Sequence, residues 1–455
     1  MAIVESEQKV LGFSDITFMT VVGNFGIRWL AVAASLGAVS IFYWIVGALM
    51  FFIPLSLICA ILSRACPKEG GVYAWTKEVL GDKSAFIVAW LYWVNNIFYY
   101  PAILIFLASN LAYALGMPML IDNHWYVTVV VLVSFWLVVL INTYGMKSSK
   151  FLVKFGGILG SFVPAAILIV LGFVSFIIYQ KSATDFSLIN WLPNRDIFGS
   201  LSTLTMIMFA MAGVEIIPTF AKSVKNPARD LYAGLLVGAL IILVLYVLGT
   251  VAMNIIATPD ELQKASGLMQ AFELVNQRLG IPWLTPIIGF ILIFSELAAV
   301  SIWLLAPIIM FFKCIPKGIL PEWFHQTNRH GSPQNATMFM GILVSLVVIL
   351  TNTLPSIENM YQILVLMATI LYFIPYLFLA VVFVKFRHQL RLPNFFVYTL
   401  SLFVFSSIIL GISFSFEPPG NLTTIREIIQ YEAQMIGGAT IIIGLGFWLY
   451  KRKRI

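Results

Sequence analysis

Apart from Asp15 at an expected membrane edge, three charged residues lie deep inside long apolar segments of this 455-residue chain: Arg28, Glu215 and Glu296. Inserting a charge into a bilayer costs about 2.5–3.5 kcal/mol or more, so such residues usually pair with a partner or serve a function. Arg28 could hold the anionic group of a ligand, or it could form a structural ion pair with Glu296. Glu296 could instead bind a proton that is coupled to transport. The chemistry indicated is reversible binding of charged groups.

Glycine-rich sequence interrupts two of the apolar segments near their centres, at 22–28 and at 209–215. Unpaired backbone groups cost several kcal/mol each in a bilayer, so a break persists only where protein or water satisfies them. Each restarted half-helix offers N–H groups to a carboxylate, and the half before it offers carbonyl groups to an ammonium. Alternatively, Gly23 and Gly26 could serve to let two helices pack closely, without a break in the span. Two breaks together favour a seat for a zwitterion such as an amino acid, with Glu215 capping the second half-helix.

The candidate binding residues lie at the two breaks or on later spans that could face them. Glu296 precedes Trp303 by two helical turns, so both should face the same way. Tyr372 and Tyr376 are four residues apart, and their hydroxyl groups need partners inside the protein. The predicted binding residues are Gly23, Asn24, Phe25, Gly26, Ile27, Arg28, Phe209, Ala210, Met211, Ala212, Gly213, Glu296, Trp303, Tyr372 and Tyr376.

Patterns typical of catalysis or of metal binding do not accompany these residues. The apolar segments contain no H-E-x-x-H sequence and no cluster of a nucleophile with a base. The four histidines fall in expected loops, and the three cysteines have no metal-ligand spacing. We therefore expect no catalytic residue, no cofactor and no metal. A channel is disfavoured because the sequence has no charged ring or repeated filter motif.

The composition indicates which elements position these residues. The chain is 60% hydrophobic and only 10% charged, with a mean hydropathy of +0.96, whereas soluble domains carry about 25% charged residues. A membrane-spanning helix needs about 20 apolar residues. Twelve segments are long enough, near 14–37, 40–63, 84–113, 125–145, 152–180, 197–221, 229–257, 284–314, 337–354, 359–385, 394–416 and 428–450. The predicted fold is an all-α membrane protein with 12 transmembrane helices in a single transporter domain, 1–455.

The interrupted segments are the first and the sixth, so the sequence predicts two repeats of five spans. The first repeat covers about 13–180 and the second about 197–385, with two extra C-terminal helices at about 394–450. Most Lys and Arg residues fall on the side that both chain ends share, which predicts cytoplasmic termini in a cytoplasmic membrane. Topology then accounts for the net charge of +7, and we expect no nucleic-acid partner.

The loop between the seventh and eighth spans carries a helix signal. Thr258 can cap a helix with Glu261 reaching back, and Pro259 suits the first helical position. Apolar residues then recur every three or four positions up to Leu279, which gives one apolar face. This helix could lie over the outer mouth as a lid, or it could rest on the membrane surface.

Several stretches carry a family resemblance. They are Pro67-Lys68-Glu69-Gly70-Gly71-Val72-Tyr73-Ala74-Trp75, Ala212-Gly213-Val214-Glu215, Asn226-Pro227-Ala228-Arg229-Asp230, Ser266-Gly267-Leu268-Met269-Gln270, and Trp303 with Pro307. The chain resembles the amino acid–polyamine–organocation superfamily, and within it the glutamate/γ-aminobutyrate antiporter group, from the first span to about the tenth. The resemblance implies two inverted five-helix repeats with spans 1 and 6 unwound. It also implies cargo held between the breaks near Tyr372 and Tyr376, alternating access, and a lid after span 7.

The chain departs from that group at three places. The group has a carboxylate four residues before the span-8 tryptophan. This chain has Ala299 at that position, which is a further candidate binding residue, and its nearest acidic residue, Glu296, lies about one turn away. Gly26-Ile27-Arg28 replaces an aromatic cluster at the first break. The sequence ends at Ile455 without a long tail, so acid gating by such a tail is not expected. These departures argue against glutamate as the cargo.

The sequence thus predicts a secondary active transporter of amino acids, an antiporter of the glutamate/γ-aminobutyrate type that works by alternating access. The alternative is a proton-coupled symporter of neutral amino acids or amines. Arg28 in the site would favour cargo with an extra carboxylate, whereas pairing of Arg28 with Glu296 would favour neutral amino acids. Expected partners are the amino acid or amine, the lipid bilayer and, for symport, protons. The protein is expected to be a monomer or a homodimer.

Overall fold

The computed structural model describes residues 11–66, 70–143, 146–193, 201–315, 318–329, 332–352, 354–390, 392–418, 422 and 424–452. Within these ranges the chain is helical, and β pairing is limited to one isolated bridge between Leu11 and Val224. Eleven helices of the described part are long and apolar enough to cross a membrane. The first predicted span is not among them because its break divides it. The predicted all-α, multi-span membrane fold is confirmed, whereas the inverted relation of the two repeats stays a prediction.

The helices follow the predicted spans closely. They are α1 Phe13–Asn24, α2 Trp29–Ala34, α3 Val39–Gly47, a π-helical turn Ala48–Phe52, α4 Ile53–Ala65, α5 Val72–Val94, α6 Asn96–Ala114, α7 His124–Thr143, α8 Met146–Tyr179, α9 Leu201–Ala210, the 3-10 helix η5 Val214–Ser223, α10 Tyr232–Ile256, α11 Gly267–Leu279, α12 Leu284–Cys314, α13 Gln334–Thr351, α14 Ile357–Leu390, α15 Asn394–Ser415 and α16 Ile425–Arg452. The third span is longer than predicted, because α5 begins at Val72, kinks at Gly81 and leads into α6. Positions 197–200 of the sixth predicted span, and Pro67, Lys68 and Glu69, lie outside the described residues.

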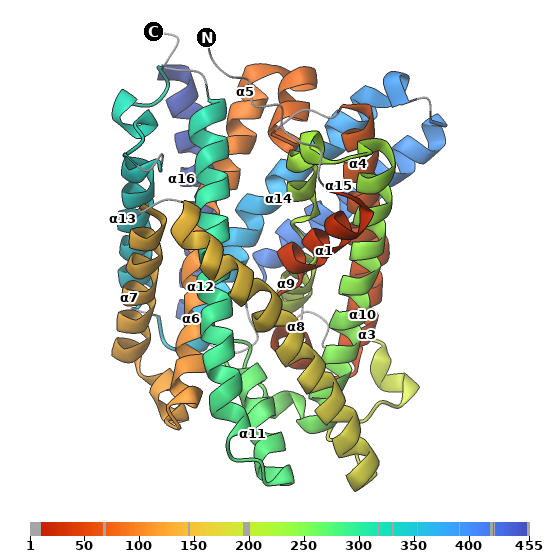
Figure 1. The fold of residues 1–455 in the computed structure, drawn as a ribbon, viewed down its shortest axis with the longest axis vertical. Coiled ribbons are helices and arrows are strands. Elements are labelled where there is room, and N and C mark those ends of the chain that lie inside the picture. Colours follow the sequence, from red (N-terminus) through yellow and green to blue (C-terminus); the bar gives the residue numbers. More distant parts are fainter. Residues whose placement is uncertain are drawn as a thin grey trace.

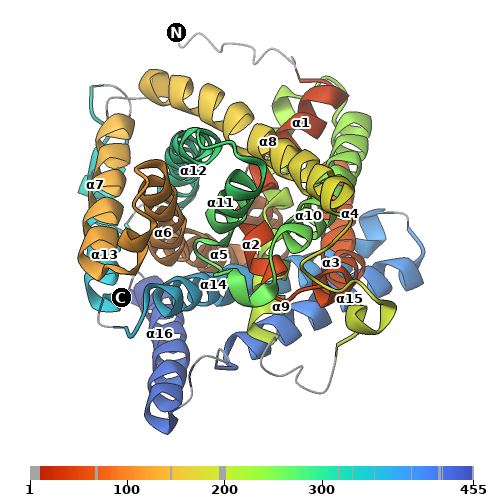
Figure 2. The same cartoon turned by 90° about the horizontal axis from the view of Figure 1, so that it is seen from below.

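The half-helices α2 and α9, next to the breaks, lie in the interior of the bundle. Figure 2 shows α2 near the middle, with α7 and α13 along one side and α16 projecting at another. All six residues of α2 are buried, whereas only 17% of the apolar stretch of α16 is covered by protein. Gly23 at the first break is exposed, whereas Asn24, Phe25 and Ile27 are buried. The backbone groups of these buried residues must find partners in the protein.

Both predicted breaks are present. The first span stops at Asn24, Phe25 is extended, and the helix restarts at Trp29. The second stops at Ala210 and restarts as η5, which is a 3-10 helix. Gly213 has a φ of +119°, and a Cβ there would lie 2.3 Å from Oδ1 of Asn24. Only glycine tolerates both that conformation and that close approach of the two breaks.

The loop after α10 forms a helix at one end of the bundle, the end opposite the last turn of α16 (Figure 1). The Thr258–Glu261 capping box is present, but it starts only a 3-10 turn, Pro259–Glu261. The α-helix itself begins later than predicted, at Gly267, because Leu262 is extended. The apolar face of α11 is buried against α2, α10 and α12. It therefore rests on protein, as a lid would, and not on the membrane surface.

Candidate functional site

A cavity of about 130 Å³ lies between the two breaks and α12. Many of the predicted binding residues line it, namely Gly23, Asn24, Phe25, Gly26, Arg28, Phe209, Ala210, Ala212, Gly213, Glu296, Ala299 and Trp303. The cavity is also lined by residues that were not predicted from the sequence, namely Val22, Trp29, Tyr99, Ile103, Ile216, Ile217 and Ser295. The two interrupted spans thus meet at one cavity, as their glycines predicted.

Four predicted binding residues lie elsewhere. Ile27 is fully buried away from the cavity wall, and the Met211 side chain packs beside Gly47 of α3. Tyr372 and Tyr376 do not line the cavity either, because their hydroxyl groups are bound to Glu215. In this conformation these four side chains do not line the cavity, and their contact with cargo stays a prediction.

Arg28 and Glu296 form a buried ion pair at the cavity wall. Nη1 of Arg28 lies 3.5 Å from Oε2 of Glu296, longer than the about 2.7–2.9 Å of a tight charge-assisted hydrogen bond. Nη2 donates a hydrogen bond to the Tyr99 hydroxyl. The guanidinium carbon is 4.8 Å from the Trp29 ring centre and 5.3 Å from that of Tyr99, and such aromatic faces attract a cation. The loose pair leaves Arg28 able to bind a second anionic group.

Tyr246 on α10 satisfies backbone groups at both breaks. Its hydroxyl accepts the N–H of Gly26 at 3.1 Å and donates to the carbonyl of Ala210 at 2.9 Å. Its ring stacks on Trp44 with the centres 4.3 Å apart. The indole N–H of Trp44 in turn donates to Thr250 at 3.0 Å. One side chain thus removes most of the cost of two unpaired backbone groups in an apolar interior.

Glu215 caps the second break, as expected, and it also has three tyrosine partners. Its Oε2 accepts the N–H of Gly213 at 3.2 Å. The hydroxyl groups of Tyr92, Tyr372 and Tyr376 donate to the same carboxylate at 2.9, 2.5 and 2.6 Å. Because the carboxylate is fully engaged behind the break and does not line the cavity, it holds the restarted helix in place.

Asn24 supplies a polar group inside the cavity. Its Nδ2 donates to the carbonyl of Thr20 at 2.7 Å. Its Oδ1 is buried and has no hydrogen-bond partner among the described residues. A buried acceptor without a partner costs free energy, so it is suited to a donor group that enters with a ligand.

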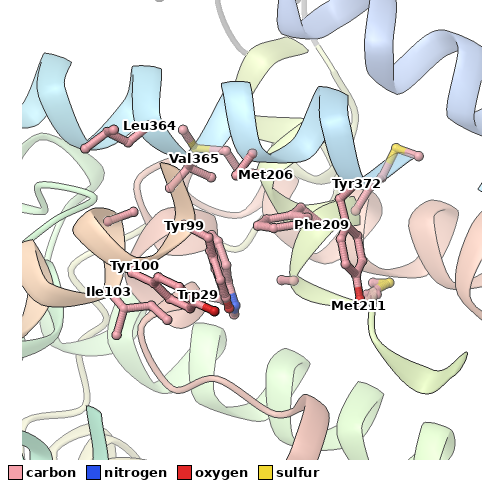
Figure 3. Close-up of a cluster of buried hydrophobic side chains, with 14 of the residues drawn as sticks. Trp29, Tyr99, Tyr100, Ile103, Met206, Phe209, Met211, Leu364, Val365 and Tyr372 are labelled. Atoms are coloured by element: carbon pink, nitrogen blue, oxygen red, sulfur yellow. The ribbon is translucent and has the colours of Figure 1, made fainter. Parts of the chain in front are cut away.

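Aromatic rings close one side of the cavity. Figure 3 shows Phe209 between Tyr99 and Tyr372. The Phe209 ring meets Trp29, Tyr99 and Tyr372 edge to face, with ring centres 5.7, 5.4 and 5.6 Å apart. Edge-to-face contacts of this kind add to the stability gained from burial. The rings make a wall that separates the Arg28 side of the cavity from the Glu215 cluster.

The residues that the sequence analysis missed gave only weak signals. Tyr99 and Tyr246 carry hydroxyl groups within apolar spans, and such groups need hydrogen-bond partners. The chain has 17 tyrosines, so this property does not single out these two. Nothing local distinguishes these two. Their importance arises from contacts with residues 71 and 220 positions away in the chain.

Comparisons with known proteins agree with this geometry. Residues 11–441 match the family described as amino acid permease. An uncharacterized transporter of Legionella pneumophila is 30% identical over 98% of this chain and 97% of its own length. A probable agmatine/putrescine antiporter of Lactococcus lactis is 25% identical over 72% of this chain and 69% of its own length. A glutamate/γ-aminobutyrate antiporter of the same species is 24% identical over 67% of this chain and 61% of its own length.

Proposed function

This chain belongs to the amino acid permease family, and from that premise we propose that it exchanges amino acids by alternating access. The observation that carries the proposal is the cavity between the two breaks, where Arg28, Glu296 and Asn24 meet. The cavity lies in the interior of a multi-span membrane protein. A passenger bound there would be released to either side when the surrounding helices move.

The charges of the cavity favour cargo without net charge. Among the residues that line it, Arg28 and Glu296 have charged side chains, and the two charges offset one another. A cation or a dianion would enter with an unbalanced charge in a medium of low dielectric, which is costly. We therefore infer that the cargo is a zwitterionic neutral amino acid, or an ω-amino acid such as the product of acidic amino acid decarboxylation.

Two groups suit the two ends of a zwitterion. The unpartnered Oδ1 of Asn24 can accept hydrogen bonds from an ammonium group. Arg28, whose contact with Glu296 is long, can bind the cargo carboxylate with its planar guanidinium. The cargo is then held between the first break and α12.

Exchange is favoured because two of the relatives are named as antiporters. Proton-linked symport is the second candidate, and Glu296 is the observation that favours it. When Arg28 turns to the cargo carboxylate, the buried Glu296 loses its partner, and a proton would then neutralise it.

Reconstitution into liposomes separates the two candidates. Uptake of labelled neutral amino acid that requires unlabelled amino acid inside would support exchange. Uptake into empty liposomes that requires an inward proton gradient, and that a protonophore stops, would support symport instead. If no amino acid or amine entered under either condition, the proposal would be refuted.

Binding can be tested on the purified protein. We expect neutral amino acids to raise the thermal unfolding midpoint more than lysine, agmatine or glutamate do. Arg28→Gln should abolish this shift. Ser301→Ala is the matched control, because it removes a buried hydrogen bond to Asn142 from the same helix, α12, outside the cavity. It should lower the midpoint but leave the shift caused by the amino acid unchanged.

A further inference from the structure

An apolar groove of about 810 Å³ lies on the outer side of the bundle, apart from the cavity at the breaks. Its walls come from α5, α6, α12, α13 and α16, and Trp93, Phe311, Phe339 and Leu343 are among the lining side chains. Protein covers only 33% of the apolar stretch of α13 and 17% of that of α16. In a membrane the groove therefore opens to lipid.

The groove is a fixed part of the fold because α16 is anchored on α5. The indole N–H of Trp90 donates to the carbonyl of Ile442 at 3.0 Å. A Cβ at Gly446 would lie 2.5 Å from Trp90, so glycine there lets the two helices approach closely. The gap beside this contact cannot close by moving α16 inward.

The groove has the length of one leaflet. Ile442, Leu445, Leu449 and Arg452 all line it and recur every three or four residues on one face of α16. A helix rises about 1.5 Å per residue, so this stripe is about 15 Å long, half of the about 30 Å hydrocarbon core. The apolar part lies toward mid-membrane and the arginine marks the membrane surface.

The charge at the open end is positive. Arg452 lines the groove, with its guanidinium 5.5 Å from the Trp448 ring centre, and Lys451 is exposed beside it. Lys83 lies at the adjacent start of the α5 span, with Nζ 5.3 Å from the Phe447 ring centre. No lining residue is acidic, and Glu322, on a neighbouring turn, is exposed outside the groove. A cationic end on an apolar slot complements an anionic lipid.

We propose that this groove binds an anionic phospholipid of the leaflet at the C-terminal end of α16. One acyl chain lies along the Ile442–Leu445–Leu449 stripe, where it fills space that would otherwise lack packing partners. The phosphate contacts Arg452. Basic pockets between helices on the cytoplasmic side suit such headgroups, and the positive-inside rule places this end of α16 there. The inference is independent of the cargo.

Native mass spectrometry of the full chain, released from detergent with added lipid, tests this proposal. The probes are phosphatidylglycerol and phosphatidylcholine with the same acyl chains. We expect phosphatidylglycerol to bind preferentially. Arg452→Gln should weaken that preference about fivefold, whereas Lys451→Gln should weaken it less, because Lys451 lies beside the groove and does not line it.

A second pair of variants tests the apolar slot. Leu445→Trp fills the groove and should remove the bound lipid. Ile441→Trp places the same bulk at a 64% exposed position of the same helix outside the groove and should retain it. Equal binding of the two lipids, or equal loss in Leu445→Trp and Ile441→Trp, would overturn the proposal. So would a change from dimer to monomer in Leu445→Trp, because a second copy of the chain would then occupy the groove.

Discussion

The Arg28–Glu296 pair is buried and lines the cavity, and variants can separate a structural role from the proposed binding role. Removing one member leaves a buried charge without its partner, which costs about 3–5 kcal/mol. We expect Glu296→Gln alone to lower the thermal unfolding midpoint strongly. The double variant Arg28→Met, Glu296→Leu should recover most of that loss, because an apolar pair can replace a buried ion pair. It should not bind amino acids. Retained binding in the double variant would show that the pair is only structural.

Tyr246 provides a second prediction at the level of single residues. Tyr246→Phe leaves the N–H of Gly26 and the carbonyl of Ala210 without their common partner. An unsatisfied buried polar group costs about 1–3 kcal/mol. We expect a loss of stability together with a marked fall in transport, since the two breaks are no longer joined.

Tyr431→Phe is the matched control for Tyr246→Phe. Tyr431 is also buried, and its hydroxyl donates to the carbonyl of Ser415 at 2.6 Å, far from the breaks. It should lose comparable stability but transport normally per folded molecule. If Tyr246→Phe behaved in the same way, the proposed bridge between the breaks would not be needed for transport.

At the scale of the elements, Gly213 lets the second span stop and restart next to the first. Gly213→Ala would strain a backbone with φ of +119° and place Cβ 2.3 Å from Asn24. A strained residue costs about 1–3 kcal/mol, and the collision adds to that. Gly81→Ala, where φ is also positive but nothing lies within 4 Å, measures the strain alone. We expect loss of ligand-induced thermal shift in Gly213→Ala only; the same loss in both variants would contradict a role for the contact.

The start of α11, the proposed lid, is joined to α14 by the carboxylate of Glu358. Glu358 accepts the backbone N–H groups of Lys264 and Ala265, each at 3.2 Å, and lies 3.9 Å from Nζ of Lys264. Glu358→Gln should loosen the start of α11. Each carboxylate oxygen of Glu358 accepts one of the two backbone N–H groups, whereas the glutamine side chain has a single oxygen that can accept. Hydrogen exchange in residues 264–275 should then rise severalfold. Glu273→Gln is the control, because within the described part of the chain Glu273 bonds to neighbours on α11, Asn276 and Gln277.

This lid contact should also depend on pH. Burial lowers the pKa of Lys264, and the carboxylate of Glu358 opposes that shift. The closed lid therefore binds the Lys264 proton less tightly than the open lid does. Raising the pH through the lowered pKa favours closure, and in Glu358→Gln this transition should move to lower pH. Exchange in residues 264–275 is then compared after correction for the intrinsic rise of amide exchange with pH, and a protection that does not change with pH near this range would argue against it.

At the scale of the whole molecule, the membrane environment makes the spanning helices predictable from the sequence, whereas the partners in the candidate binding site are harder to predict. Spans follow from runs of apolar residues because backbone groups must be satisfied within each helix. Both breaks were visible because glycine marks them. The start of α11 at Gly267 was missed, since a capping box at Thr258 does not reveal that Leu262 is extended. Tyr99, Tyr246 and Tyr92 could not be predicted as the partners of Arg28, Gly26 and Glu215, because these contacts join residues far apart in the sequence.

The orientation of the whole molecule remains a prediction that cysteine labelling can test. The positive-inside rule places both termini in the cytoplasm. The turn Pro118–Asp122 between α6 and α7 would then face outward, as would α11 (Figure 1). In a cysteine-free background, Met119→Cys, at an 81% exposed site, should react with an impermeant maleimide in intact cells. His388→Cys, exposed near the end of α14, should react only after the cells are opened. The reverse pattern would invert the topology, place the lid in the cytoplasm and move the lipid groove to the outer leaflet.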